Sequence, residues 1–305
     1  MSETSIHRWH EGVLQPLDYC DMSRTLVAAA DSWLVTEGTA LALDLHRQRF
    51  LDAVEVFAET HRLATDPRAE APRFWDAAID LIPREGDWFP RVELQSRSDG
   101  TLFVLRLRSA PERTRSVVLA TFDGPDPRRS PTIKGPDTDA LLAARTSVQP
   151  RGAGEAVILS ADGDGSGAKG NGGAGYVVEG AYSALLWWRG DALCSPSPEL
   201  ERVDSVTARS VIALATALGI DVLYESVAPA DLDGLEIWAL SALHGIRIVT
   251  SWVDGPLVAE QPGRLATWRA RLDRLRRALP ERIAPDQIAP GRIAMDQIGA
   301  ESLPV

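Results

Sequence analysis

The chain has 305 residues, of which 45% are hydrophobic and 25% charged, and this composition suits a globular protein large enough for two lobes. Its 32 basic and 43 acidic residues give a formal net charge of −11, which disfavours general attraction to nucleic acid or anionic membranes. Cys20 and Cys194 lie far apart without a CxxC or Cys/His cluster, so neither a disulfide framework nor a metal site is expected.

The start of the chain and its apolar runs bear on location. The first residues, MSETSIHRWHEG, lack the basic and then apolar pattern of a signal peptide. No apolar run reaches the roughly 18–20 residues of a membrane helix. We therefore expect a cytoplasmic protein that does not enter a membrane.

Apolar periodicity predicts a mixed α/β fold. Residues 31–43 have the pattern of two short strands around a Glu-Gly turn, and residues 45–64 have the apolar spacing of a helix. The alternation over 101–110 and 114–123 is typical of antiparallel strands. Further strands are expected within residues 155–161, 175–194, 221–228 and 235–255, and helices over 203–220, which stops at Gly219, and over 264–280.

Two stretches have compositions that do not suit a packed core. Residues 161–175, ADGDGSGAKGNGGAG, predict a flexible loop between two strands. Residues 282–300, RIAPDQIAPGRIAMDQIGA, form an imperfect short repeat with prolines that interrupt any helix. We interpret residues 281–305 as a disordered tail.

The elements together predict two α/β lobes. We expect a smaller lobe over residues 1–123, a connection over 124–134 and a larger lobe over 135–280. Lys134 falls at the seam between the lobes, and ligand sites favour such seams. The chain has one other lysine, Lys169, in the glycine-rich loop. The ordinary alternative is that Lys134 is a solvated loop cation.

The residue types around this seam suit carbonyl chemistry on a phosphorylated group. A lysine that burial or neighbouring cations drive toward its neutral form can form a Schiff base. The segment DSVT, residues 204–207, precedes an apolar helix, and a helix start binds phosphate through backbone N–H groups. Arg49 in HRQRF can add a charge-assisted bond, and Glu179 on an apolar strand can pair with a protonated ring nitrogen. Each feature alone also fits a helix cap, a surface arginine or a strand-edge glutamate.

The order of the motifs HRQRF, IKG, GYVVEG, SVT and SALHGIRIV resembles the class IV, or fold-type IV, pyridoxal-phosphate enzymes. That group includes branched-chain aminotransferases, D-amino acid aminotransferases and 4-amino-4-deoxychorismate lyase. The resemblance covers roughly residues 30–275. It implies the two-lobed D-amino acid aminotransferase-like α/β fold with mixed sheets and pyridoxal 5'-phosphate at the lobe seam. It also implies a small amino acid or aminodeoxychorismate-like substrate and a homodimer.

The resemblance also implies roles for single residues. Lys134 would be the catalytic lysine that holds the cofactor as a Schiff base and moves a proton, and Glu179 would keep the pyridine nitrogen protonated. The residues implied in cofactor binding are Arg49, Lys134, Glu179, Ser205, Val206, Thr207, Ser241 and Ala242. His244 and Arg247 are candidates for the substrate mouth, the alternative being that they only belong to the motif's architecture.

Three departures from the family pattern affect the assignment of function. Ala184 stands where members usually carry an Asn, and Ala208 stands where the phosphate turn usually carries an Arg. The Ser-Ala-Leu of residues 241–243 is closer to the Asn-Ala-Leu of deoxychorismate lyases than to the Gly-Thr of aminotransferases. We expect an aminotransferase that moves an amino group from an amino acid to a keto acid. The alternatives are 4-amino-4-deoxychorismate lyase, which releases pyruvate and p-aminobenzoate, and a catalytically impaired cofactor-binding relic.

Overall fold

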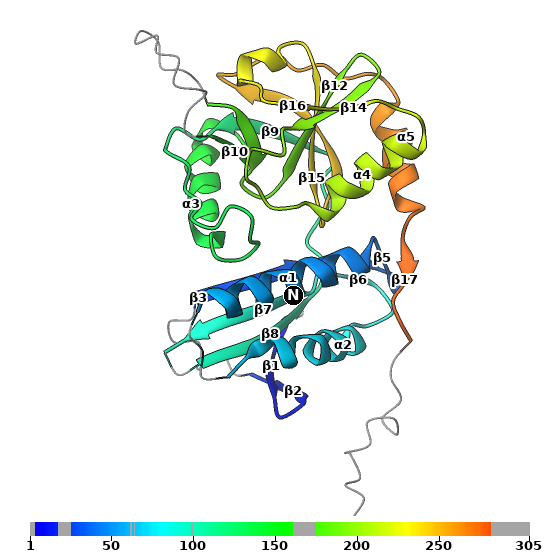
Figure 1. The fold of residues 1–305 in the computed structure, drawn as a ribbon. Helices are drawn as coiled ribbons and strands as arrows, with labels where there is room; N and C mark the ends of the chain where they lie inside the picture. The colour runs from blue at the N-terminus through cyan, green and yellow to red at the C-terminus, as the bar shows by residue number, and fades with distance from the viewer. Residues whose placement is uncertain are drawn as a thin grey trace, which may run out of the picture.

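The computed structural model describes residues 4–17, 26–61, 63, 65–98, 100–160 and 175–281. The glycine-rich segment apart from Gly175, the tail beyond Glu281, and the residues Cys20 and Lys169 lie outside these ranges. The described elements gather into two bodies, with the N-terminal elements below and the eight-stranded sheet above in Figure 1. No described helix is both long and apolar enough to cross a membrane.

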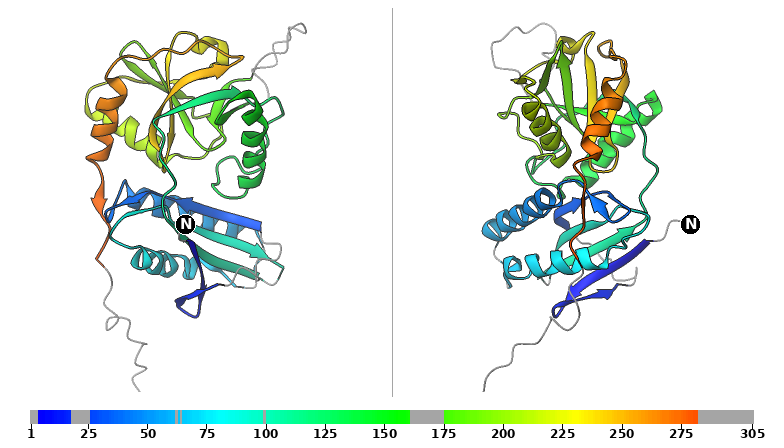
Figure 2. Two further views of the ribbon diagram at one scale, coloured as in Figure 1. Left: turned by 180° about the vertical axis from the view of Figure 1, so that it is seen from behind. Right: turned by 90° about the vertical axis from the view of Figure 1, so that its right-hand side faces the viewer.

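The N-terminal body is built on a five-stranded antiparallel sheet with the order β2-β1-β8-β7-β3. Its strands are β1 (Thr4–His10), β2 (Val13–Pro16), β3 (Leu26–Ser32), β7 (Arg91–Arg97) and β8 (Gly100–Arg108). Helices α1 (Leu43–Thr60) and α2 (Ala71–Leu81), preceded by the 3-10 turn η2 (Pro67–Ala69), lie on the same side of this sheet (Figure 2).

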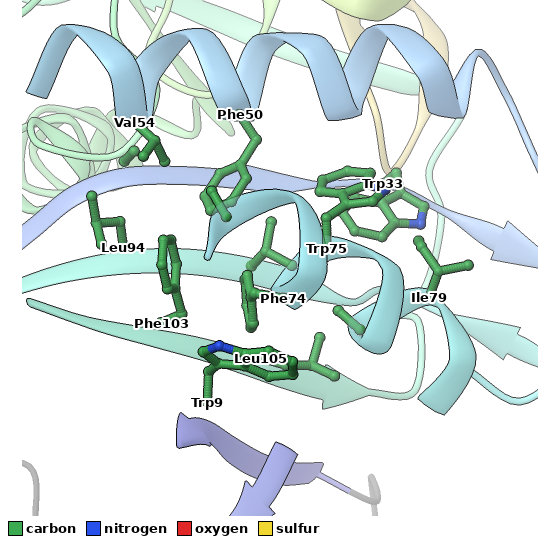
Figure 3. Close-up of a cluster of buried hydrophobic side chains, with 14 of the residues drawn as sticks. Trp9, Trp33, Phe50, Val54, Phe74, Trp75, Ile79, Leu94, Phe103 and Leu105 are labelled. Carbon is green, nitrogen blue, oxygen red and sulfur yellow. The ribbon is translucent and has the colours of Figure 1, made fainter. Parts of the chain in front are cut away.

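The core of this body lies between the helices and the sheet. Helix α1 buries His46, Phe50, Ala53, Val54 and Phe57, whose spacing places them on one face. Figure 3 shows Phe50 of α1 facing Phe74 and Trp75 of α2, with side chains of the sheet beneath them. The helix expected over residues 45–64 therefore forms because its apolar face has a sheet to cover.

A small sheet with the order β17-β5-β4-β6 lies at the edge of this body. Its strands are β4 (Val35–Thr36), β5 (Thr39–Ala40), β6 (Asp87–Trp88) and β17 (Arg277–Ala278). Glu37 and Gly38 have φ angles of 45° and 67°, which suit the tight turn of a two-residue hairpin, so the strands expected around this turn are present. Strand β17 joins the end of the described chain to the N-terminal body.

The second body holds a mixed eight-stranded sheet with the order β11-β10-β9-β16-β15-β12-β13-β14. Its strands are β9 (Ser116–Thr121), β10 (Glu155–Leu159), β11 (Val177–Gly180), β12 (Ala184–Arg189), β13 (Ala192–Pro196), β14 (Val222–Glu225), β15 (Glu236–Ser241) and β16 (Gly245–Val253). Its helices are α3 (Thr138–Val148), α4 (Val206–Ala217) and α5 (Arg264–Asp273), with 3-10 turns η3 (Gln149–Arg151) and η4 (Pro229–Leu232).

Two predicted elements differ in the structure. Strand β9, which the expected smaller lobe of residues 1–123 included, does not pair with β8 and instead lies parallel to β10 and β16 in the larger sheet. Alternation marks a strand but does not identify its partner, which long-range packing decides. The helix expected over 264–280 ends at Asp273, because the chain turns there to form β17 against β5.

Candidate active site

Lys134 is held against strand β3 by its own backbone. Its carbonyl accepts a hydrogen bond of 2.7 Å from the backbone N–H of Ala30. The next residue, Gly135, has a φ of 132°, and a Cβ there would lie 2.8 Å from the nitrogen of Ala30. Only glycine allows so close an approach at this φ. The sequence Lys-Gly therefore fixes the lysine between the two bodies.

The amine of Lys134 lies among charged groups of both signs. Lys134 is half-buried over the whole residue, but its amine lies deep in the protein. Burial of the amine, followed by the charges of Arg49 and Arg91, lowers the pKa of Lys134 to about 8. The carboxylates of Asp31 and Glu179 act in the opposite direction. An amine with this pKa is neutral far more often near pH 7 than an ordinary lysine, as a nucleophile must be.

Asp31, a residue that the motifs do not include, organises the N-terminal side of the site. Its buried carboxylate accepts hydrogen bonds from Nε and Nη2 of Arg49, both 2.8 Å, and from Nδ1 of His46 at 2.7 Å. Burial alone would raise its pKa, but the Arg49 guanidinium and His46 hold the pKa of Asp31 well below its usual range. A carboxylate within the apolar run AAADSW is the sequence signal that could have identified it.

Arg49 connects the two bodies. Its Nη1 donates a hydrogen bond of 2.8 Å to the carbonyl of Asp204, just before helix α4. Its contacts to Asp31 and Asp204 use three of the five N–H groups of a guanidinium. The remaining donors suit an additional anion between α1 and the start of α4.

The start of α4 and the β15–β16 turn share a small cavity of about 30 Å³, comparable to the volume of one water molecule. Ser205 caps the helix by accepting a hydrogen bond of 3.3 Å from the N–H of Ala208, and Val206 and Thr207 follow as buried residues. The cavity is lined by residues that can hold an anion and by the turn that carries them, namely Thr207, Ser241, Ala242, His46, Arg113 and Arg276. Helix N–H groups, hydroxyls and guanidinium groups are the donors that hold a phosphate, so this cradle fits the phosphate end of pyridoxal phosphate.

Glu179 lies on β11, 6% exposed, and is paired with an arginine that sequence reasoning missed. Nη1 of Arg128 donates to Oε1 of Glu179 at 2.6 Å, while Arg128 also binds the carboxylate of Asp126. Burial raises the pKa of Glu179 to about 7, and Arg128 opposes that rise. No described residue donates a hydrogen bond to Oε2, so this oxygen suits a protonated ring nitrogen. Nothing in the segment PDPRRSP indicates locally which arginine reaches the glutamate.

The two substrate candidates lie elsewhere in the second body. Nδ1 of His244 accepts a hydrogen bond of 3.1 Å from the N–H of Thr114, and burial together with nearby arginines lowers the pKa of His244 to about 4. Arg247 is 5% exposed and lies 3.3 Å from the carboxylate of Glu155. Neither lines the small cavity. Their part in substrate binding stays a prediction.

The structure thus groups the predicted residues in two sets. In the first set, Arg49 and Glu179 both shift the pKa of Lys134, in opposite directions. In the second set, Thr207, Ser241 and Ala242 line one cavity beside α1. A second cavity of about 860 Å³ contains neither Lys134 nor Glu179. Although it is larger, the charged groups that support chemistry lie at the lysine. Within the described ranges, no three His, Cys, Asp or Glu side chains gather to hold a metal ion.

Comparisons with known proteins identify the family and the fold of the chain. The family model of amino-transferase class IV matches residues 28–252. No curated protein sequence matches the chain significantly.

Solved structures match over most of the chain. A hypothetical aminotransferase from Mycobacterium tuberculosis in its apo form is 18% identical, with a TM-score of 0.69 over 91% of this chain and 99% of that chain. The branched-chain amino acid aminotransferase from Thermobaculum terrenum in its PLP form is 17% identical, with a TM-score of 0.72 over 88% and 93%. The branched-chain aminotransferase from Thermoproteus uzoniensis with norvaline is 16% identical, with a TM-score of 0.71 over 88% and 94%. The expected class IV fold is confirmed.

Proposed function

Because the chain belongs to the amino-transferase class IV family, we propose that it is a pyridoxal-phosphate-dependent aminotransferase in which Lys134 binds the cofactor. The observation that carries this proposal is the setting of Lys134. It lies at the junction of the two bodies, and burial beside Arg49 lowers the pKa of its amine to about 8. A solvated loop cation would keep its ordinary pKa, so the alternative reading of Lys134 explains less.

Lys134 has two tasks in this proposal. When bound, pyridoxal phosphate supplies a ring that accepts electrons from the substrate's amino carbon. Nζ of Lys134 would hold the cofactor and would serve as the base that moves the proton of that carbon. With a pKa of about 8, about a tenth of the amine is neutral at pH 7. A base whose pKa lies near the working pH transfers protons in both directions efficiently.

The phosphate would bind between the two bodies. Arg49 would approach from α1, and the N–H groups of Val206 and Thr207 and the Thr207 hydroxyl would approach from the start of α4. Ser241 and Ala242 of the β15–β16 turn complete the cradle. Asp31 positions Arg49 through its two hydrogen bonds, so its role is indirect.

Glu179 would hold the ring nitrogen in its protonated state through Oε2. Arg128 favours the charged form of this carboxylate and fixes Oε1, so one oxygen is left for the cofactor. Arg128 is therefore a positioning residue for Glu179. We further propose that His244 and Arg247 face the substrate and that the enzyme works as a homodimer.

The decisive experiment is chemical labelling of the purified protein. We expect a yellow protein with pyridoxal phosphate and, after borohydride reduction, cofactor attached to the peptide that contains Lys134. The matched control is Lys134→Ala, which should not be labelled. Label on Lys169, or no label, would contradict the assignment. A colourless protein that binds no cofactor would exclude the relic as well as the enzyme.

One sequence feature favours a lyase as the second candidate. The turn Ser241-Ala242-Leu243 is closer to the lyase pattern, and in the structure Ser241 Oγ holds it by accepting the N–H of His244 at 3.2 Å. The reaction products separate the two functions. Transfer that requires a keto acid acceptor indicates the aminotransferase, whereas pyruvate and p-aminobenzoate formed without an acceptor indicate the lyase.

A further inference from the structure

An apolar groove runs between the two bodies on the side of helices α1, α2 and α4. Its volume is about 860 Å³. Apolar side chains of all three helices and of β17 line it, among them Leu43, Ile79, Ala213, Leu214, Ala217 and Ala278. Figure 1 shows α4 above the start of α1, with β17 descending beside them. Neither Lys134 nor Glu179 borders this groove, and Leu41 separates it from the small cavity, since it lines both.

Helix α4 has an apolar face that the described residues leave uncovered. Val211 and Ala215 are buried in the core of the second body. On the neighbouring face, Ala213 and Ala217 are exposed and line the groove, and Leu214 lines the groove while it also packs against that core. A helix that is apolar on two faces is expected to be covered on both. The groove is therefore a surface that lacks its covering partner within the described ranges.

The end of the described chain forms one wall of this groove. After β17, Pro280 and Glu281 line it, and Arg84 holds that point by donating a hydrogen bond of 2.9 Å to the carbonyl of Pro280. Residues 282–305 continue from there. A segment tethered at the groove has an effective local concentration on the order of millimolar, which a separate partner lacks.

The sequence of that segment suits the groove. It contains a ten-residue repeat, RIAPDQIAPG followed by RIAMDQIGAE, which places an isoleucine every five residues, at 283, 288, 293 and 298. Each repeat begins with an arginine, Arg282 and Arg292. Each repeat also carries an aspartate, Asp286 and Asp296, and the groove is bordered by both acidic and basic side chains, so charge does not distinguish the segment. The isoleucines are what match the apolar lining of the groove.

We propose that residues 282–305 bind in the groove of their own chain, with the isoleucines of the repeat covering α4 and the start of α1. This inference does not rest on the cofactor. It has a consequence for the active site, however, because α1 carries Arg49 and α4 carries Thr207. A segment that bridges these helices fixes the two halves of the phosphate cradle relative to each other.

The test places a photo-crosslinking residue at Ala213 in the full-length chain. Isotopically light and heavy chains are mixed before irradiation, so that mass spectrometry separates adducts within one chain from adducts between chains. We expect adducts to residues 282–305 of the same chain. The matched control is the same residue at Val56, which is 42% exposed on α1 but outside the groove, and it should give no such adduct.

Two variants test whether the isoleucines provide the contact. The double variant Ile288→Asp, Ile293→Asp should reduce the yield of the adduct by about tenfold or more, because burial of two isoleucines is lost. The control pair Gln287→Asp, Gln297→Asp adds the same charge within the repeat and should leave most of the adduct. Adducts between chains would overturn the proposal in favour of a second copy, and the absence of any adduct to residues 282–305 would overturn it outright.

Discussion

Replacing Lys134 by methionine should stabilise the cofactor-free protein at neutral pH. The fall of the lysine pKa from 10.5 to about 8 corresponds to an unfavourable free energy of about 3 kcal/mol for the charged amine in the folded state. Because the residue is only half-buried, solvent screening reduces this, and we expect a gain of roughly 1.5–3 kcal/mol in the free energy of unfolding. Methionine fills a similar volume, and no described residue accepts a hydrogen bond from the lysine amine.

The sign of the pH dependence makes this prediction specific. The folded state binds the lysine proton more weakly than the unfolded state, so the penalty is fully present below about pH 8 and disappears as pH rises toward 10.5. The advantage of Lys134→Met should therefore be large at about pH 7 and small above about pH 10.

Urea unfolding of the cofactor-free protein, followed by tryptophan fluorescence, measures this difference at the two pH values. Arg73→Met is the control, since its side chain is 62% exposed and its ion pair with Glu70 should contribute less than about 1 kcal/mol at either pH. A variant that is less stable than the wild type at neutral pH, or equally stabilised at both pH values, would refute the account of Lys134.

Three further predictions concern residues around the lysine. Arg128→Met should raise the pKa of Glu179 above about 7, because a positive neighbour is lost. The acidic limb of the kcat/KM profile should then move upward by about one pH unit, and an unchanged limb would mean that Arg128 does not control the charge of Glu179. Arg49→Ala should weaken the affinity for pyridoxal phosphate by about ten- to a hundredfold in a titration at fixed ionic strength. Thr207→Ala should weaken it by less, because the helix N–H groups remain. Wild-type affinity in Arg49→Ala would exclude Arg49 from the phosphate site. Gly135→Ala should lower the free energy of unfolding in urea by about 1–3 kcal/mol, since the φ of 132° and the close contact with Ala30 both oppose a Cβ. Equal stability would mean that the backbone around Lys134 can shift away from β3.

Elements with local signals could be predicted from the sequence. Helix α1 follows its apolar spacing, α4 follows the Ser205 cap, and the β4–β5 hairpin follows its Glu37-Gly38 turn. Strand β3 is different, because its sequence LVAAADS has three alanines, which lack strand preference. It forms because β7 pairs with it and α1 covers it. Such strands depend on partners that are distant in the sequence.

The same distinction applies to the site. Lys134, Arg49 and Glu179 each belong to a short motif, so resemblance can indicate them. Asp31 and Arg128 matter only because folding places one beside Arg49 and the other beside Glu179, across 18 and 51 residues of chain. No local pattern encodes such pairs. A buried carboxylate among alanines nevertheless requires a cation, so Asp31 could have been flagged without its partner being known.

The departure at Ala208 does not remove positive charge from the proposed phosphate cradle. The neighbouring Arg209 does not replace the absent arginine, since it is half-exposed and binds the carboxylate of Asp204 at 2.8 Å. Arginines from other parts of the chain, Arg113 and Arg276, instead border the cavity beside Thr207. Arg276 follows α5 and already donates to the carbonyls of Leu34 and Thr39, so its position is fixed by the small sheet. Because phosphate requires positive charge and N–H donors rather than one sequence position, the proposed cradle would keep its chemistry with cations from different elements.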